Sequence, residues 1–224
     1  MMAYKIDLAN AAYSPEYMDY RNEIIIAAYN EKYKTGEETF EDNFIKVIHE
    51  YYCTSNKKYY CENSKIYKNN SLLHEYFNLD DSVGFFCEYI KYSNGQDYIF
   101  YKEDLYGYSV FEVTTKNIFN YYPRATFKDK EETFIGTDIH YNINNNIFAA
   151  GGCYWACPSD VFLVKADNPM EQFSELINIH EIIGFGNNID FAGWNNNDIV
   201  LKIDDEKRIN ITEKEYMKEM IKIK

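Results

Sequence analysis

Short apolar runs separated by polar clusters fill the chain from residue 44 onward. The runs are rich in Tyr, Phe, Ile and Val, and Asn, Gly, Asp and Ser lie between them. This pattern is typical of consecutive antiparallel strands. The clearest turn is Ser93 to Gln96, because its Asn-Gly pair favours the positive φ angles of a two-residue hairpin. We therefore predict a mainly β protein.

The predicted strands form a weak internal repeat, which indicates a fold built from similar units. Three copies contain four short strands each, and a fourth, more degenerate copy contains three. The strands are 44–52, 58–61, 65–68 and 72–77 in the first copy, 85–92, 98–101, 109–113 and 118–122 in the second, 134–141, 147–151, 160–164 and 173–179 in the third, and 189–194, 199–203 and 208–211 in the fourth.

These antiparallel four-stranded units, about four of them, resemble the blades of a β-propeller. The resemblance covers about residues 44–211 and concerns the general blade pattern only, since the Gly-His and Trp-Asp dipeptides of the best-known propeller repeat are missing. No family function is therefore carried over. An irregular β-sandwich or meander is the alternative, because its strands also recur at short intervals. In a propeller we expect one early strand to pair with the last unit and close the ring.

Helix signals lie at the two ends of the chain. Ser14 followed by Pro15 is typical of a helix start, and Tyr17, Tyr20, Ile24 and Ala28 would then share one face. Strands also fit parts of residues 14–52, so both states stay open there. Near the other end, Thr212 and Glu215 have the spacing of a capping box, which favours a short helix, although a strand also fits. We divide the chain into an N-terminal segment, 1–43, packed on a repeated antiparallel β domain, 44–224.

The composition is that of a folded and strongly acidic protein. Of the 224 residues, 46% are hydrophobic and 18% are aromatic, which is enough for a sizeable core. The formal net charge is -13, and phosphate binding depends on Lys and Arg, so we expect no nucleic-acid partner. No apolar run approaches the ~18 residues of a membrane span, and the first residues lack a signal-peptide pattern. We predict a soluble, cytoplasmic protein that binds no membrane.

The most unusual segment is Gly151 to Asp160, which holds two thiols, two large aromatic side chains and a proline. Cys153 and Cys157 would be too far apart on an extended strand for a disulfide, and only a tight or helical turn would let them pair. A zinc site would need two further ligands, for which the candidates are Cys87, His140 and His180. Five scattered cysteines in a chain of this size favour free, buried thiols, and we predict no metal and no cofactor.

Asp138 and His140 alternate on a predicted strand, so both side chains would point to one face. A carboxylate that orients an imidazole could activate Cys153 or Ser159 as the nucleophile of an acyl-transfer site. The spacing matches no known nucleophile motif. This pair defines the alternative function, a hydrolase or metal-dependent enzyme centred on residues 153–160 and His140. The other histidines have no evident partner in the sequence, and we interpret them as structural or exposed: His49, His74 and His180.

Loops at one end of the predicted units would bring aromatic residues and carboxylates together. In a propeller, the loops between the second and third strands emerge on the same face as the connections between blades. Tyr and Trp there would give large contact area at low entropic cost, although they could equally cover the end of the core. The predicted binding residues are Asp80, Asp81, Tyr106, Tyr108, Tyr154, Trp155 and Asp160.

This acidic, aromatic loop face predicts a non-enzymatic binding module that recognises a protein partner. A sharper hypothesis makes the partner a basic toxin or nucleic-acid-binding protein, which the chain inhibits by occupying its cationic site. The negative net charge would speed such association through electrostatic steering. The same charge explains ordinary solubility equally well, so it does not choose between these partners.

Overall fold

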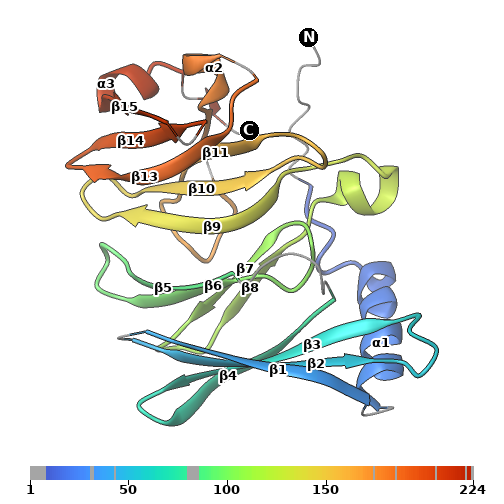
Figure 1. The fold of residues 1–224 in the computed structure, drawn as a ribbon. Helices are drawn as coiled ribbons and strands as arrows, with labels where there is room; N and C mark the ends of the chain where they lie inside the picture. Colours follow the sequence, from blue (N-terminus) through green and yellow to red (C-terminus); the bar gives the residue numbers. More distant parts are fainter. Residues whose placement is uncertain are drawn as a thin grey trace.

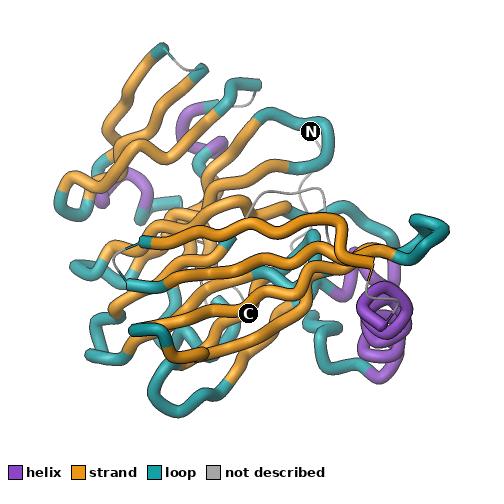
Figure 2. The backbone as a smooth tube through the Cα atoms, turned by 60° about the horizontal axis from the view of Figure 1, so that its bottom comes forward, coloured by secondary structure: helices purple, strands orange, loops and turns teal. Residues whose placement is uncertain are grey.

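The structure, a computed structural model, describes residues 9–30, 33–42, 44–79, 86–173, 175–184, 186–204, 206–219 and 221–222. These residues form four antiparallel sheets and few helices, so the prediction of a mainly β fold is confirmed (Figure 2). The sheets are stacked in chain order, with the first at one end and the fourth at the other (Figure 1).

Each sheet consists of strands that are mostly neighbours in chain order. The first sheet contains β1 (Tyr33–Glu41), β2 (Lys46–Cys53), β3 (Tyr60–Lys68) and β4 (Ser71–Asn78), and the second contains β5 (Cys87–Lys91), β6 (Asp97–Tyr101), β7 (Tyr108–Glu112) and β8 (Ile118–Tyr121). The third contains β9 (Ile135–Asn142), β10 (Ile147–Cys153), β11 (Ser159–Lys165), β12 (Glu175–Asn178) and β16 (Ile221–Lys222), and the fourth contains β13 (Ile189–Asn195), β14 (Asp198–Ile203) and β15 (Lys207–Ile211). The helices are α1 (Pro15–Asn30), the π-helical turn η1 (Ala125–Asp129), α2 (His180–Ile183) and α3 (Glu213–Tyr216).

The strands of the second, third and fourth copies lie where the apolar pattern predicts them, but the first copy is wrong in two places. A single strand, β3, runs through the predicted strands 58–61 and 65–68, and β1 precedes residue 44. The polar residues Asn63 and Ser64 do not interrupt β3, because both are buried and hydrogen-bonded. Asn63 Nδ2 donates to Glu75 at 3.1 Å, and Ser64 Oγ lies 2.8 Å from His49 Nδ1.

The hairpin between β5 and β6 is one residue longer than the Asn-Gly pair predicts. The Tyr92 N–H donates to the Gln96 carbonyl at 2.9 Å, so three residues form the loop. Within this loop only Gly95 has a positive φ, +81°. The Asn94 side chain accepts the Gln96 N–H at 2.8 Å. This is a three-residue loop with glycine in the left-handed position, a common hairpin connection.

Both predicted helix starts are confirmed. The Ser14 hydroxyl accepts the Tyr17 N–H at 3.2 Å at the start of α1, and the capping box of α3 is formed. The strand alternative holds as well near the end of the chain, where β16 pairs with β12. The predicted apolar face of α1 is wrong at one position, because Arg21 is buried and Tyr20 is 45% exposed.

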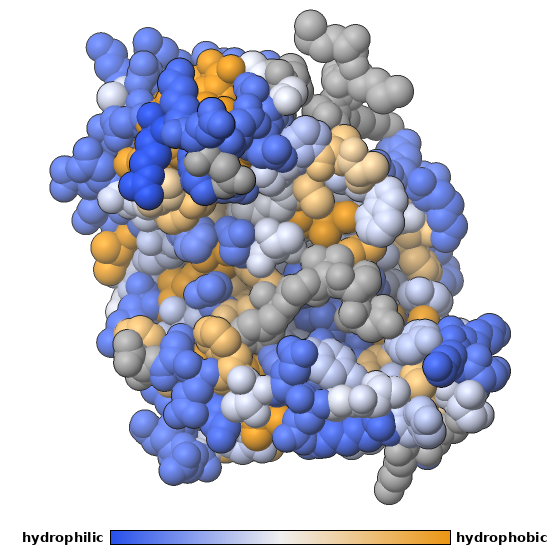
Figure 3. Space-filling view, in the orientation of Figure 1, coloured by the Kyte–Doolittle hydropathy of each residue, from blue (hydrophilic) through white to orange (hydrophobic). Residues whose placement is uncertain are grey.

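The core lies between consecutive sheets, and hydrophilic residues cover much of the face of the molecule seen in Figure 3. Examples of its buried residues are Val47, Ile66, Ile99 and Phe111 between the first and second sheets, Phe100, Val110, Phe148 and Phe162 between the second and third, and Leu163, Ile177, Ile199 and Leu201 between the third and fourth. In the described part of the chain, no such cluster joins the fourth sheet to the first. The expected pairing of an early strand with the last unit is wrong there too, since β1 pairs with β2. Among the same residues, no helix has the length and hydropathy that crossing a bilayer requires.

Candidate functional site

Two of the seven predicted binding residues, Tyr106 and Trp155, meet in a surface groove. Its cavity volume is about 340 Å³, and we call it the aromatic groove. Three separate connections build it, which follow β6, β8 and β10 in the chain. The residues that define the groove are Tyr106, Thr126, Lys130, Glu131, Glu132 and Trp155.

A tight turn holds Trp155 at the edge of this groove. The Cys157 N–H donates to the Tyr154 carbonyl at 2.9 Å, and Ala156 has a φ of +59°. The Trp155 N–H donates to the Glu132 carboxylate, which ties the turn to the connection after β8. Its side chain is 63% exposed. A large aromatic side chain is therefore presented to solvent beside a carboxylate.

The structure does not place Tyr108 and Tyr154 in the groove. The Tyr108 ring stacks on Phe173 with centroids 4.6 Å apart, and burial raises the pKa of its hydroxyl. Tyr154 packs edge-on against Phe134 at 5.8 Å. Both rings thus belong to the core between the second and third sheets. Asp80 and Asp81 lie outside the described residues.

Asp160 is buried and faces a histidine rather than the groove. Its Oδ2 lies 3.1 Å from His180 Nε2, and its Oδ1 accepts the Val161 N–H at 2.7 Å. Burial raises the pKa of Asp160 to about 6, against the opposing effect of His180. The sequence carries no local signal for this pair, because α2 follows β11 only after β12.

Asp138 and His140 share one face of β9, as predicted, with Oδ1 and Nε2 3.0 Å apart. The His140 ring also stacks on Phe191. Within the described ranges, however, no hydrogen bond or ion pair joins His140 to Cys153 or Ser159, and the Cys153 pKa is raised by burial. This pair therefore lacks the activated nucleophile of an acyl-transfer site.

A second serine and histidine pair lies between the first and second sheets. His49 Nδ1 is 2.8 Å from Ser64 Oγ, and the same nitrogen contacts the Glu62 carboxylate. A catalytic triad places the serine and the carboxylate on opposite nitrogens of the imidazole. Because Ser64 and Glu62 both face Nδ1, the arrangement is structural. Nor does any group of three His, Cys, Asp or Glu side chains among the described residues suit a metal ion.

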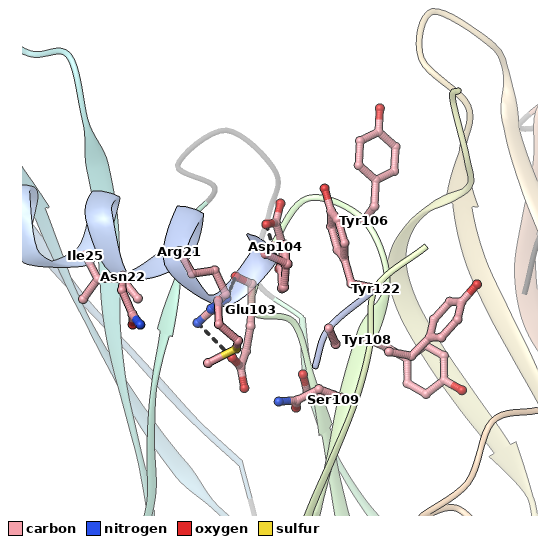
Figure 4. Close-up of a pocket in the computed structure, with 14 residues that line it drawn as sticks. Arg21, Asn22, Ile25, Glu103, Asp104, Tyr106, Tyr108, Ser109 and Tyr122 are labelled. Carbon is pink, nitrogen blue, oxygen red and sulfur yellow. Dashed lines mark hydrogen bonds and ion pairs between the residues drawn. The ribbon is translucent and has the colours of Figure 1, made fainter. Parts of the chain in front are cut away.

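Next to the aromatic groove lies a cavity of about 150 Å³ between α1 and the second sheet (Figure 4). We call it the α1 cavity. Arg21 Nη2 forms an ion pair with Glu103 Oε2 at 2.9 Å, and Arg21 also donates to the Glu103 and Phe77 carbonyls. The Tyr17 hydroxyl donates to Asp104 at 3.0 Å. Tyr106 lines both the cavity and the groove, so the two are neighbours.

Sequence reasoning missed the α1 cavity. A signal was present, since Arg21 lies four residues after Tyr17 and three before Ile24 on the buried face of α1. A charged residue in an apolar helical stripe needs a buried partner. The sequence could not identify Glu103 as that partner, because the contact depends on how α1 sits against the sheets.

All five cysteines are free thiols. Cys53, Cys61 and Cys87 are buried, whereas Cys153 is half-buried and Cys157 is exposed, so the prediction of buried thiols is wrong for Cys157. Burial raises the pKa of Cys61 to about 11.

The chain matches no protein-family model, and no curated protein sequence matches it. The site is therefore interpreted from its own geometry.

Proposed function

We propose that the protein is a non-enzymatic binding module that holds a basic segment of a protein partner in the aromatic groove. One observation carries this proposal. Tyr106 and Trp155, from two different loops, line the same groove as Glu131 and Glu132. A lysine or arginine side chain in such a groove would find aromatic faces and carboxylates together.

The chemistry of the groove favours a cationic ligand over a neutral one. A cation over an aromatic ring gains about 0.5 to 2 kcal/mol, depending on desolvation. The two carboxylates outnumber the single ammonium group of Lys130. Burial raises the pKa of the Tyr106 hydroxyl, and the nearby negative charges of Glu132 and Asp104 raise it further. An exposed tryptophan at the rim is also typical of binding hot spots.

The kind of partner follows from charge on a larger scale. The net charge of -13 would steer a basic protein toward this surface. A basic toxin or a nucleic-acid-binding protein is such a partner, and binding would block its cationic site. The pairs Asp138–His140 and Ser64–His49 support a role without catalysis, because neither presents an activated nucleophile.

We further propose that the four sheets are related, blade-like units of an open, propeller-like arrangement. Each unit contains a meander of three or four consecutive strands, to which β16 adds a fifth strand in the third sheet, and each sheet packs face to face on the next. The five free thiols support a reducing, cytoplasmic setting.

The groove is tested with a fluorescent peptide of alternating arginine, lysine and glycine, against a matched peptide with glutamine at the basic positions. We expect the protein to raise the fluorescence anisotropy of the basic peptide but not that of the glutamine peptide. The affinity for the basic peptide should fall with added salt. Trp155→Ala should weaken binding by about tenfold, which is about 1.4 kcal/mol. Glu132→Gln should weaken it less, since glutamine can still accept the Trp155 N–H.

Ile143→Ala is the matched control, because Ile143 is 57% exposed but lies outside the groove. Its affinity should equal that of the unaltered protein. Equal binding of both peptides, or full binding by Trp155→Ala, would show that the groove is not a cation-binding site.

A further inference from the structure

We infer that Cys153 and Cys157 form a redox-active dithiol that a peroxide converts into a disulfide around Trp155. The sequence sets one condition for this pairing, a tight turn between the two residues. The structure provides that turn, with the Cys157 N–H bonded to the Tyr154 carbonyl at 2.9 Å. A four-residue turn brings its first and last Cα atoms within about 7 Å.

The hairpin of β10 and β11 holds the two cysteines in one short loop. Cys153, the last residue of β10, pairs directly with Ser159 at the start of β11. Cys157 lies in the five-residue connection between these paired residues, at the end of the turn that starts at Tyr154. Because directly paired Cα atoms are about 4.5 to 5.5 Å apart, the connection is closed at its base. A disulfide needs Cα atoms about 4.4 to 6.8 Å apart, and such a tight loop is compatible with that separation.

The environment gives the two thiols different roles. Cys157 is exposed, so a peroxide in solution reaches it directly. Cys153 is half-buried, and burial, followed by the charges of Cys157 and Glu132, raises its pKa. Cys153 is therefore the less accessible of the two thiols, and we assign it the second step, the attack on an oxidised Cys157. The charge of Cys157 is one of the causes that raise the Cys153 pKa, which fits two sulfur atoms that lie near each other.

The oxidation proceeds in two balanced steps. The Cys157 thiolate attacks one oxygen of the peroxide, so an S–O bond forms, the O–O bond breaks and hydroxide leaves. The Cys153 sulfur then attacks the Cys157 sulfenic acid, forming the S–S bond, and the hydroxyl group leaves as water with the Cys153 proton. For hydrogen peroxide, two thiols are oxidised to one disulfide and the peroxide is reduced to two water molecules.

The disulfide would act on the aromatic groove, because Trp155 lies inside the ring that it closes. A closed ring restricts the turn that presents Trp155, so oxidation fixes the rim of the groove. This consequence rests on the proposed function of the groove, whereas formation of the disulfide does not.

The test exposes the reduced full-length protein to hydrogen peroxide, alkylates the remaining thiols in denaturant and maps the peptides by mass spectrometry. We expect one disulfide, between Cys153 and Cys157. Cys53, Cys61 and Cys87 should be recovered alkylated, since they are buried, and they serve as internal controls. In a Trp194→Phe background Trp155 is the only tryptophan. The new disulfide beside it should quench its tryptophan fluorescence until a dithiol reductant is added.

Two variants assign the order of the steps. Cys157→Ser should leave Cys153 reduced, because the exposed thiol that reacts first is missing. Cys153→Ser should drive Cys157 to sulfinic acid or to a disulfide between two chains, because the resolving thiol is missing. Serine at these partly exposed positions changes little of the core, and unchanged circular dichroism would confirm the fold.

The inference is overturned if both cysteines are recovered reduced, or if unaltered protein gives sulfinic acid at Cys157 with Cys153 still reduced. A disulfide that joins two chains through Cys157 would overturn it as well. None of these readouts needs a partner. If the intramolecular disulfide forms but the basic peptide fails to bind, the proposed function falls and the dithiol assignment stands.

Discussion

The second sheet packs against its two neighbours with two different chemistries. Toward the third sheet it buries an aromatic, apolar cluster, in which Phe100 and Phe148 have ring centroids 5.2 Å apart. Toward the first sheet, the buried Tyr101 hydroxyl lies 2.9 Å from His74 Nε2 and 3.2 Å from Glu103 Oε1. Glu103 in turn pairs with Arg21 in the α1 cavity. The interface with the third sheet is mainly aromatic and apolar, whereas the interface with the first sheet adds a hydrogen-bonded series of polar groups to its apolar cluster, which includes Val47 and Ile99.

This difference explains the position of the α1 cavity. An apolar interface closes by filling volume, because any void forfeits contacts. A polar interface must instead satisfy each buried group, and it tolerates a cavity where polar side chains line the wall. The polar series from His74 to Arg21 ends at the α1 cavity, beside the aromatic groove. The aromatic groove therefore lies next to the interface in which more buried polar groups must be hydrogen-bonded.

The largest expected effect comes from breaking the apolar interface. Phe148→Ala should lower the free energy of unfolding by about 3 to 5 kcal/mol, because Phe148 is fully buried and its neighbours relax only partly into the space. Urea denaturation followed by circular dichroism measures this loss. Ile143→Ala, at an exposed position, should change the free energy by less than about 0.5 kcal/mol. If Phe148→Ala lost as little stability as Ile143→Ala, this cluster would not be the core.

A much smaller deletion should lower the free energy of unfolding when it removes a buried polar group between the first and second sheets. Ser64→Ala removes one oxygen atom, yet it should cost about 1 to 3 kcal/mol, because His49 and Glu62 lose a buried partner. The matched control is Thr115→Ala, since the Thr115 hydroxyl also donates to a carboxylate, that of Glu112, but is exposed. It should cost less than about 0.5 kcal/mol. Equal losses for the two variants in the same denaturation assay would contradict a special role for the buried network.

The same contrast explains how far the sequence could predict the fold. In the second, third and fourth sheets, short runs of apolar residues mark the strands, and their positions follow from the pattern alone. In the first sheet the inward positions include His49 and Ser64, which resemble loop residues in a sequence. Their burial depends on partners across strands and sheets, so no local pattern reveals it. The split of β3 follows from this, whereas β1 was missed because nearly all of its residues are exposed and mostly polar, so no apolar pattern marks it.

The site shows the same limit. Trp155 and Tyr106 could be grouped from the sequence because both follow a predicted strand of the repeat. Asp160 was placed on the same face by its position in the repeat, whereas its carboxylate pairs with His180, which the sequence left without a partner. Which way a side chain turns at the end of a strand depends on what is packed there. Loop position was predictable, and side-chain burial was not.

The buried pair of Asp160 and His180 extends the comparison to the pH dependence of stability. Because burial raises the pKa of Asp160 from 3.8 to about 6, the folded protein holds this proton more tightly than the unfolded chain does. Stability contributed by Asp160 is therefore lost as the pH rises from about 4 to about 6. Asp160→Asn has no such proton to lose, so its stability relative to the unaltered protein should rise between pH 4 and 7. One pKa unit corresponds to about 1.4 kcal/mol, so we expect a change of about 1 to 3 kcal/mol.

Asp138→Asn is the control with the opposite sign. Although partial burial acts to raise the pKa of Asp138, His140 lowers it below its usual value. Its contribution to stability is therefore present above its unfolded pKa and is lost on acidification. Relative to the unaltered protein, Asp138→Asn should lose stability as the pH rises. Parallel trends for the two variants in urea denaturation at several pH values would show that burial does not govern Asp160.

The smallest effect is expected from a single polar contact inside the apolar interface. The Tyr92 hydroxyl donates to the Ala166 carbonyl, and both residues are buried in the aromatic cluster. Tyr92→Phe keeps the ring and its stacking on Tyr141 and removes this hydrogen bond. The cost should be about 0.5 to 1.5 kcal/mol, because packing supplies most of the stability at this interface. Tyr20→Phe, at an exposed position, should cost less than that. If Tyr92→Phe cost as much as Phe148→Ala in the same assay, the second and third sheets would depend on hydrogen bonding as much as the first and second do, and the contrast between the two interfaces would fail.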